Sequence, residues 1–427
     1  MNFLKSISKT PLFRISSLNS LSVMLKLAIG LVTSKVIAIF VGPSGMALVG
    51  NLRNFIASLE TISTLGFQNG IVKYTAESDS DEVALKKIIS TLFFSLGGVA
   101  ILLSLILFCF SGFWNVMVFG NNASYDFVFK ALAIAMPWYA FSIVLIAVIN
   151  GLGKFKEVIY TTIFGNIIGL LLSVMLILQY HTFGALLAII VAPSLLFVVS
   201  FFYVNKEIPL FKYISGHSVS SDLIKKLSVF SLMAVVSAVI SPLVFLAIRN
   251  NVIASIGMEQ AGFWEAISRI STYYLMFITT VCGVYFLPKL VKAKDSTETK
   301  AVFWSYYKGI IPVFIVALIV LFFLKDLAIR ILFTKDFLLV KDLFFWQLFG
   351  DILKACSLIL GYNLVAKKHT KVFIITEFIS MGIMFFGSKF LITLYGIEGV
   401  VMAHCFTYLV YLLVLSIYFR KILFRMD

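Results

Sequence analysis

Twelve stretches of about twenty apolar residues follow one another along the chain, separated by short polar intervals. A helix needs roughly 20 apolar residues to cross a bilayer core of about 30 Å. Backbone groups find no water there, so each stretch must satisfy its own hydrogen bonds as a helix. The sequence therefore predicts an all-α integral membrane protein with 12 transmembrane helices. The expected spans are 15–41, 46–67, 88–110, 127–149, 158–179, 184–204, 227–248, 262–287, 303–324, 342–365, 372–392 and 397–419.

The composition excludes most water-soluble classes. Hydrophobic residues make up 61% of the chain and charged residues only 13%, about half the roughly 25% of soluble domains. A soluble enzyme, a disordered chain and a small disulfide scaffold are all ruled out on this basis. All four cysteines fall within apolar spans, so we expect neither a disulfide framework nor a metal site.

The basic residues give the orientation. Lys and Arg number 35 against 20 Asp and Glu, for a formal net charge of +15. If the N-terminus is cytoplasmic, 22 of these 35 basic residues fall in cytoplasmic segments and 5 in exterior ones. The positive-inside rule therefore places both termini in the cytoplasm. A nucleic-acid partner is not expected, because the basic residues punctuate apolar runs and do not gather on a soluble face.

The spans fall into two groups of six around a polar interval. This pattern predicts an N-lobe over 1–205, a cytoplasmic linker over 206–226 and a C-lobe over 227–427. Many transporters are built from such repeats, with the substrate site between them. No nucleotide-binding P-loop sequence occurs, and no extramembrane segment is long enough for a catalytic domain. We therefore expect a secondary transporter or flippase, with no catalytic residues and no metal.

Charged residues inside the spans are the candidate site, because each costs at least about 2.5–3.5 kcal/mol at the bilayer centre. Cations there suit the phosphate oxygens of an anionic substrate. Acids can release those cations or carry a proton or sodium ion; salt bridges that fix packing are the structural alternative. Spacing pairs Glu265 with Arg269 and Asp351 with Lys354. The candidate cations are Lys26, Lys35, Arg53, Arg269 and Lys354, and the candidate acids are Glu60, Glu265, Asp351 and Glu377.

Several motifs together resemble those of one family. In the first half these are Gly-Leu-Val-Thr-Ser-Lys at 30–35, Phe-Val-Gly-Pro-Ser-Gly at 40–45, Asn-Leu-Arg-Asn-Phe at 51–55, and Gln-Asn-Gly at 68–70 with Lys73-Tyr74. In the second half they are Trp-Gln-Leu-Phe-Gly-Asp-Ile-Leu-Lys at 346–354, Gly361-Tyr362 and Glu377. Over essentially the whole chain, the sequence resembles the Wzx-type polysaccharide flippases, notably the O-antigen and enterobacterial common antigen lipid III flippases.

This resemblance implies a MATE-like, V-shaped fold of two six-helix lobes, with a cavity lined chiefly by spans 1, 2, 7 and 8. It implies that an undecaprenyl-pyrophosphate-linked oligosaccharide moves from the inner to the outer leaflet of the bacterial plasma membrane, as part of lipopolysaccharide or other polysaccharide biosynthesis. Lys26, Lys35 and Arg53 fall where a cationic cavity would bind pyrophosphate, and Asp351 and Lys354 match the family's motif in span 10. The expected mechanism is ion-coupled alternating access by a monomer. It would use a proton or sodium gradient and no cofactor. The partners implied are a polysaccharide polymerase and a chain-length regulator.

Two other functions stay open. A multidrug or small-metabolite antiporter of the same fold would carry cations and so favour a net-acidic cavity. A membrane-embedded glycosyltransferase or polymerase would need a large exterior loop. Lipid II flippases are also near, but they usually have two additional spans. The sequence does not identify the sugars, the coupling ion or the pathway.

Overall fold

The computed structural model describes residues 11–78, 81–120, 125–228 and 231–423, and these contain helices and no β-strand. Ten helical segments in this part of the chain are long and apolar enough to cross a membrane, which confirms the prediction of an all-α, multi-pass membrane protein. These segments are Leu21–Phe40, Glu82–Cys109, Asp126–Gly151, Phe155–Glu207, Ala238–Ile256, Met258–Lys292, Ser296–Phe323, Lys335–Ala366, Thr370–Tyr395 and Glu398–Tyr418.

One of these segments is a hairpin. Helix α8 (Phe155–Glu207) is 53 residues long, but His181 has non-helical angles of φ 49° and ψ −122°. A Cβ atom built on Gly165 would clash with Leu196, and one built on Gly169 would lie 3.3 Å from the side chain of Ala192. The two positions of each pair lie within one residue of the same distance from His181, so the two halves of α8 run antiparallel in close contact. The break agrees with the interval expected between 158–179 and 184–204.

The chain divides into two compact units. Unit 1 comprises Met1–Val41 and Leu52–Val239, and unit 2 comprises Gly42–Asn51 and Ile240–Asp427. Helices α3 (Gly42–Ser63) and α11 (Ser231–Ile256) contribute residues to both. The other elements of unit 1 are α2 (Pro11–Phe40), α4 (Gln68–Glu77), α5 (Glu82–Cys109), α6 (Ser111–Phe119), α7 (Asp126–Gly151), α8, α9 (Leu210–Tyr213), η1 (Gly216–Ser218) and α10 (Ser221–Ser228).

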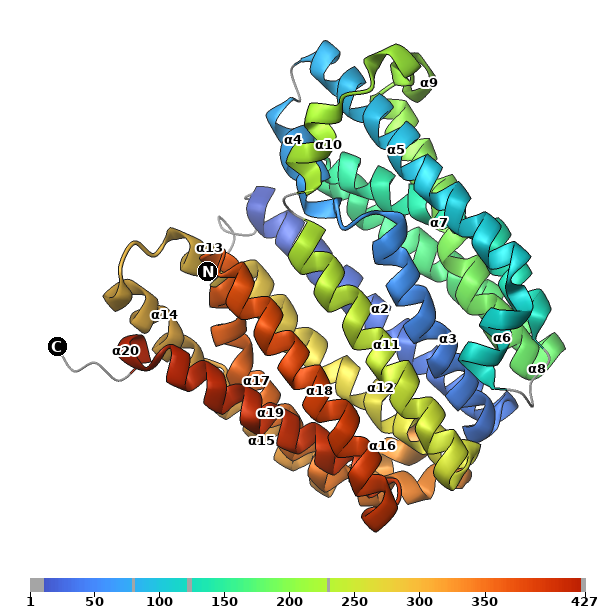
Figure 1. Cartoon of the computed structure of the whole chain (residues 1–427), viewed down its shortest axis with the longest axis vertical. Coiled ribbons are helices and arrows are strands. Elements are labelled where there is room, and N and C mark those ends of the chain that lie inside the picture. Colours follow the sequence, from blue (N-terminus) through green and yellow to red (C-terminus); the bar gives the residue numbers. More distant parts are fainter. Residues whose placement is uncertain (1–10, 79–80, 121–124, 229–230, 424–427) are drawn as a thin grey trace, which may run out of the picture. The chain divides into compact units, whose positions relative to one another are not determined.

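In unit 1, α7 packs along both α5 and α8 (Figure 1). The polar segment after α8, expected as a linker, is held to α5 by two side-chain hydroxyls. Ser90 donates a 2.5 Å hydrogen bond to the carbonyl of Tyr213 and accepts one from the amide of Ser215. Thr91 accepts a 3.0 Å hydrogen bond from the amide of Ser220. This segment therefore has a fixed path over the end of α5.

Unit 2 is organised around α17, which packs against α12 and α19, while α18 and α19 form a second hairpin (Figure 1). In that hairpin, a Cβ atom on Gly399 would clash with the backbone of Leu391. The elements of unit 2 are α12 (Met258–Val281), η2 (Cys282–Phe286), α13 (Leu287–Lys292), α14 (Ser296–Gly309), α15 (Ile311–Phe323), α16 (Lys325–Leu332), η3 (Lys335–Leu343), α17 (Phe344–Ala366), α18 (Thr370–Tyr395), α19 (Glu398–Tyr418) and α20 (Arg420–Leu423).

Candidate functional site

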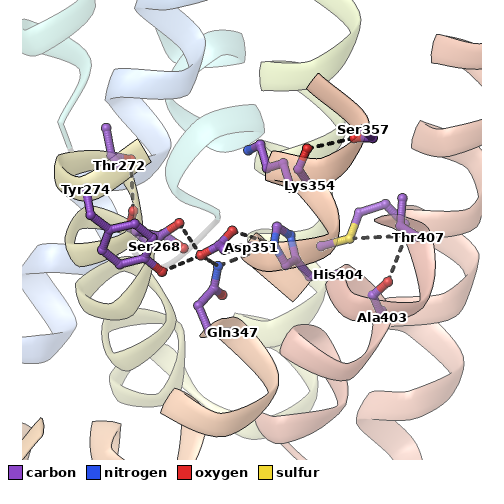
Figure 2. Close-up of polar contacts among 12 residues, drawn as sticks. Ser268, Thr272, Tyr274, Gln347, Asp351, Lys354, Ser357, Ala403, His404 and Thr407 are labelled. Atoms are coloured by element: carbon purple, nitrogen blue, oxygen red, sulfur yellow. Dashed lines mark hydrogen bonds and ion pairs between the residues drawn. The ribbon is translucent and has the colours of Figure 1, made fainter. Parts of the chain in front are cut away.

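A buried carboxylate lies at the centre of unit 2. Asp351 on α17 is fully buried, and Figure 2 shows Tyr274, Gln347 and His404 converging on it. Oδ2 accepts hydrogen bonds from Ser271 at 2.6 Å, from Gln347 Nε2 at 3.1 Å and from the Tyr274 hydroxyl. Oδ1 lies 2.9 Å from Nε2 of His404. Donors from α12, α17 and α19 thus surround one acid, and we call these five side chains the Asp351 cluster.

The cluster corrects one prediction from spacing. Within 4.0 Å, Asp351 forms its ion pair with His404 of α19 and not with Lys354. The ammonium of Lys354 lies 5.1 Å from the ring centre of Tyr408 instead. Tyr408 also packs edge-on against His404, with ring centres 4.8 Å apart. The charges of Asp351 and Lys354 still act on each other, and Tyr408 contacts both Lys354 and His404.

Lys354 lines a cavity of about 270 Å³ bounded mainly by α17, α18 and α19. Glu377 shares this cavity, as do Tyr362, Tyr408 and Tyr411 and several serines. The structure thus brings two of the predicted charges to one half-buried pocket with an aromatic wall. We call it the tyrosine cavity.

A second charged cluster in unit 2 is sealed from solvent. Glu265 contacts Arg249 at 2.6 Å and Arg269 at 3.0 Å, and the side chains of both arginines are only 3% exposed. The predicted pair of Glu265 with Arg269 is confirmed. Arg249 also contacts Asn51 at 3.4 Å and lies over the ring of Trp264. We call Arg249, Glu265 and Arg269 the ion triad.

Close backbone packing accompanies the ion triad. A Cβ atom on Gly50 would clash with the Glu265 carboxylate, and one on Gly262 would clash with the backbone of Pro43. The start of α3 therefore approaches α12 so closely at Gly262 that only glycine fits there, whereas Gly50 leaves room for the side chains of Glu265 and Arg249. In this arrangement Arg269 is a packing residue as well as a candidate cation.

In unit 1, Arg53 and Glu60 line a cavity of about 320 Å³, so they share one face of α3. Tyr139 of α7 donates a 2.6 Å hydrogen bond to Glu60. Pro193 of α8 and Thr33 of α2 lie in the same wall. We call this pocket the arginine cavity.

The two predicted lysines of α2 have different surroundings. Lys26 is exposed and Lys35 is half-buried. They are nine residues apart, which places them on opposite faces of an ideal helix of 3.6 residues per turn. Neither side chain lines the arginine cavity, although Thr33 and Ile37 of the same helix do. The arginine cavity thus includes Arg53 and Glu60 of the predicted charges.

Several polar residues of these sites were not expected, among them His404, Arg249 and Tyr139. His404 could have been found from the sequence, because it is a titratable residue within an apolar span. Arg249 lies one residue beyond the expected end of its span, and nothing in the sequence connects Tyr139 with Glu60. Among the described residues, no group of three or more His, Cys, Asp or Glu side chains could hold a metal ion.

The geometry has clear parallels among solved structures. An inward-facing multidrug resistance MATE family transporter of the MOP superfamily superposes with a TM-score of 0.73 and 13% identity, covering 94% of each chain. The lipid II flippase MurJ in an inward closed conformation gives a TM-score of 0.70 at 17% identity, over 96% of this chain and 90% of that one. Both likenesses establish the fold alone.

Sequence relatives are more informative. The lipid III flippase of Escherichia coli K12 is 28% identical over 392 residues, which cover 91% of this chain and 94% of that protein. The family model described as "Polysaccharide biosynthesis protein" matches residues 13–294. The chain therefore belongs to the polysaccharide biosynthesis protein family.

Proposed function

We propose that this protein is a flippase for a lipid-linked oligosaccharide in the bacterial inner membrane. The observation that carries the proposal is the end-to-end likeness to the lipid III flippase of Escherichia coli. A multidrug antiporter of the same fold is supported only by structures below 25% identity, which share the fold and nothing further. The activity is transport and not catalysis.

The proposed membrane topology has twelve crossings with both termini cytoplasmic. It follows if the hairpin α8 supplies two crossings and α3, which carries Arg53 and Glu60, supplies one beyond the ten apolar segments. The distribution of lysine and arginine supports a cytoplasmic N-terminus. Two six-helix lobes, 1–205 and 227–427, would then alternate their access around the cargo.

The proposed cargo is an oligosaccharide on undecaprenyl pyrophosphate, an O-antigen unit or lipid III. Its pyrophosphate would meet Lys26, Lys35 and Arg53, because guanidinium and ammonium groups suit phosphate oxygens. Arg53 opens onto the arginine cavity and Lys26 is exposed, so both can meet a ligand. Partners would be a polysaccharide polymerase and a chain-length regulator, and the flippase itself would act as a monomer.

Coupling to a proton or sodium gradient is the proposed energy source, without a cofactor. Asp351 and Glu60 are the acids best supported for it, because each is held by hydroxyl donors from other helices. A carboxylate whose hydrogen bonds come from different helices can change helix packing when its charge is neutralised. Glu265 is less suited, since two arginines hold its charge.

Reconstitution tests the function. The protein is placed in liposomes with a fluorescently labelled undecaprenyl-pyrophosphate oligosaccharide, and dithionite quenching reports the outer-leaflet fraction. We expect flipping by the wild type and by Lys308→Gln, an exposed lysine matched in type. Flipping should be lost in Arg53→Gln and Lys26→Gln. Wild-type rates in both variants would contradict the cationic site, and unchanged flipping with ionophores present would contradict ion coupling.

A further inference from the structure

The carboxylate of Glu377 lines the tyrosine cavity. Glu377 lies in an apolar helix, and the charge that acts on its carboxylate is that of Lys354 in the same cavity, although the two form no salt bridge within 4.0 Å. A carboxylate in a membrane-spanning segment is costly without a partner. A pocket that keeps such a group is therefore expected to meet hydrogen-bond donors from a ligand.

The charges of this cavity are unsuited to pyrophosphate. Among the described residues that line it, the cation is Lys354, which lies over the ring of Tyr408, and the acid Glu377 shares the cavity. The pair is close to neutral, whereas pyrophosphate brings several negative charges and would be repelled by the carboxylate. The chemistry therefore favours a ligand that is neutral or nearly so.

The walls specify that ligand further. Tyr362, Tyr408 and Tyr411 combine aromatic faces with hydroxyl groups, and serine hydroxyls lie between them. Aromatic rings cover apolar C–H surface, and hydroxyls both donate and accept hydrogen bonds. A sugar ring offers C–H faces together with a periphery of hydroxyls that can donate to Glu377 and accept from Lys354.

The size of the cavity agrees with this chemistry. Pockets for drug-sized ligands span about 300–1,000 Å³, and the tyrosine cavity holds about 270 Å³. It therefore suits a ligand of one or two rings. A Cβ atom on Gly361 would lie 3.3 Å from the Tyr411 hydroxyl, so this wall of the cavity has no room to spare.

We propose that the tyrosine cavity is a saccharide-binding subsite, which takes a sugar ring of the cargo between the carboxylate of Glu377 and the ammonium of Lys354. This proposal rests on the proposed flippase function. It assigns the glycan and the pyrophosphate to different sets of residues. Tyr408, which contacts both Lys354 and His404, connects the subsite to the Asp351 cluster.

The test uses the full-length protein in detergent and two soluble probes. One is the free oligosaccharide cleaved from the host's lipid-linked precursor, and the other is inorganic pyrophosphate. Binding is measured as the ligand-dependent shift of the thermal transition, which follows from ligand linkage. The wild type should bind the oligosaccharide, and Glu377→Gln and Lys354→Gln should weaken it at least tenfold. The matched variants Glu259→Gln and Lys389→Gln, both exposed, should bind as the wild type does.

Three outcomes would overturn the subsite. They are undiminished oligosaccharide binding in both cavity variants, no oligosaccharide binding by a wild type that still flips its lipid, and pyrophosphate binding that Lys354→Gln weakens as much as it weakens oligosaccharide binding. If Glu377→Gln or Lys354→Gln does not fold, Tyr411→Phe takes its place in the test, because it removes only a hydroxyl. It should weaken oligosaccharide binding about threefold or more. Oligosaccharide binding without any flipping would instead count against the flippase function and leave the subsite standing.

Discussion

Replacing Glu265 by glutamine should destabilise the protein more than any other single change to the ion triad. This carboxylate contacts Arg249 at 2.6 Å and Arg269 at 3.0 Å, and its own side chain is only 7% exposed. Glutamine keeps the size and one acceptor oxygen but removes the charge that both guanidiniums contact. The two buried cations would then repel each other.

The magnitude follows from what each variant leaves behind. Breaking a buried ion pair by removing one partner costs about 3–5 kcal/mol, because a charge is left buried without compensation. Arg249→Gln leaves the pair of Glu265 and Arg269 intact. It loses mainly hydrogen bonds to a charged group, worth about 1.5–3 kcal/mol. We therefore expect Glu265→Gln to cost about 2 kcal/mol more than Arg249→Gln.

Equilibrium unfolding in mixed micelles, with increasing dodecyl sulfate and circular dichroism as readout, measures both costs. The double variant should be no worse than Glu265→Gln alone, since removing Arg249 also removes half of the uncompensated charge. A free energy of unfolding for Glu265→Gln within about 1 kcal/mol of the wild type would refute the reasoning. A larger loss of unfolding free energy in Arg249→Gln than in Glu265→Gln would also refute it.

Three further predictions concern packing and the Asp351 cluster. Gly262→Ala should cost about 1–3 kcal/mol by overpacking, because its Cβ meets the backbone of Pro43, whereas Gly309→Ala, with nothing within 4 Å, should be neutral in the same unfolding assay. His181→Val should lower the free energy of unfolding by about 1–3 kcal/mol, since a β-branched residue tolerates a positive φ poorly. His181→Gly should keep wild-type stability, and equal stability of the two variants would contradict the positive φ at this bend. Asp351→Asn turns an amide donor toward groups that already donate, so it should cost about 1–3 kcal/mol and stop flipping in liposomes, while Glu398→Gln should change neither. Normal transport by Asp351→Asn would remove that carboxylate from the coupling role.

The membrane helices were predictable because length and hydropathy alone decide them. Where the structure describes it, each expected span coincides with helix, apart from a few residues at the span ends, such as 64–67, and the break at Ile310 between α14 and α15. The bend at His181 falls in the interval expected between two spans. Short polar elements such as α4 and α10 were not expected, because they carry no long apolar run. Their positions depend on tertiary contacts, for example the hold of Ser90 and Thr91 on the segment before α10.

The sites were predictable only where partners share a helix. Glu265 and Arg269, one turn apart, pair as their spacing indicates. Asp351 does not follow its spacing, because its partners come from α12 and α19, as many as 80 residues away in sequence. A single sequence says which charges are buried in the membrane, but not which helix supplies the group that satisfies them.

The cations of the two units differ in their exposure and in the charges that lie beside them. In unit 2, Arg249 and Arg269 are sealed around Glu265, and Lys354 shares its cavity with Glu377. In unit 1, the exposed Arg53 lines a cavity in which the acid among the described residues, Glu60, accepts a hydrogen bond from Tyr139. A multiply charged anion needs an accessible excess of cations, so pyrophosphate should bind through unit 1 and the glycan through unit 2. Arg53→Gln should then weaken pyrophosphate binding at least tenfold and leave the free oligosaccharide unaffected, while Lys354→Gln should do the reverse. Loss of both ligands in either variant would mean that pyrophosphate and glycan share one site.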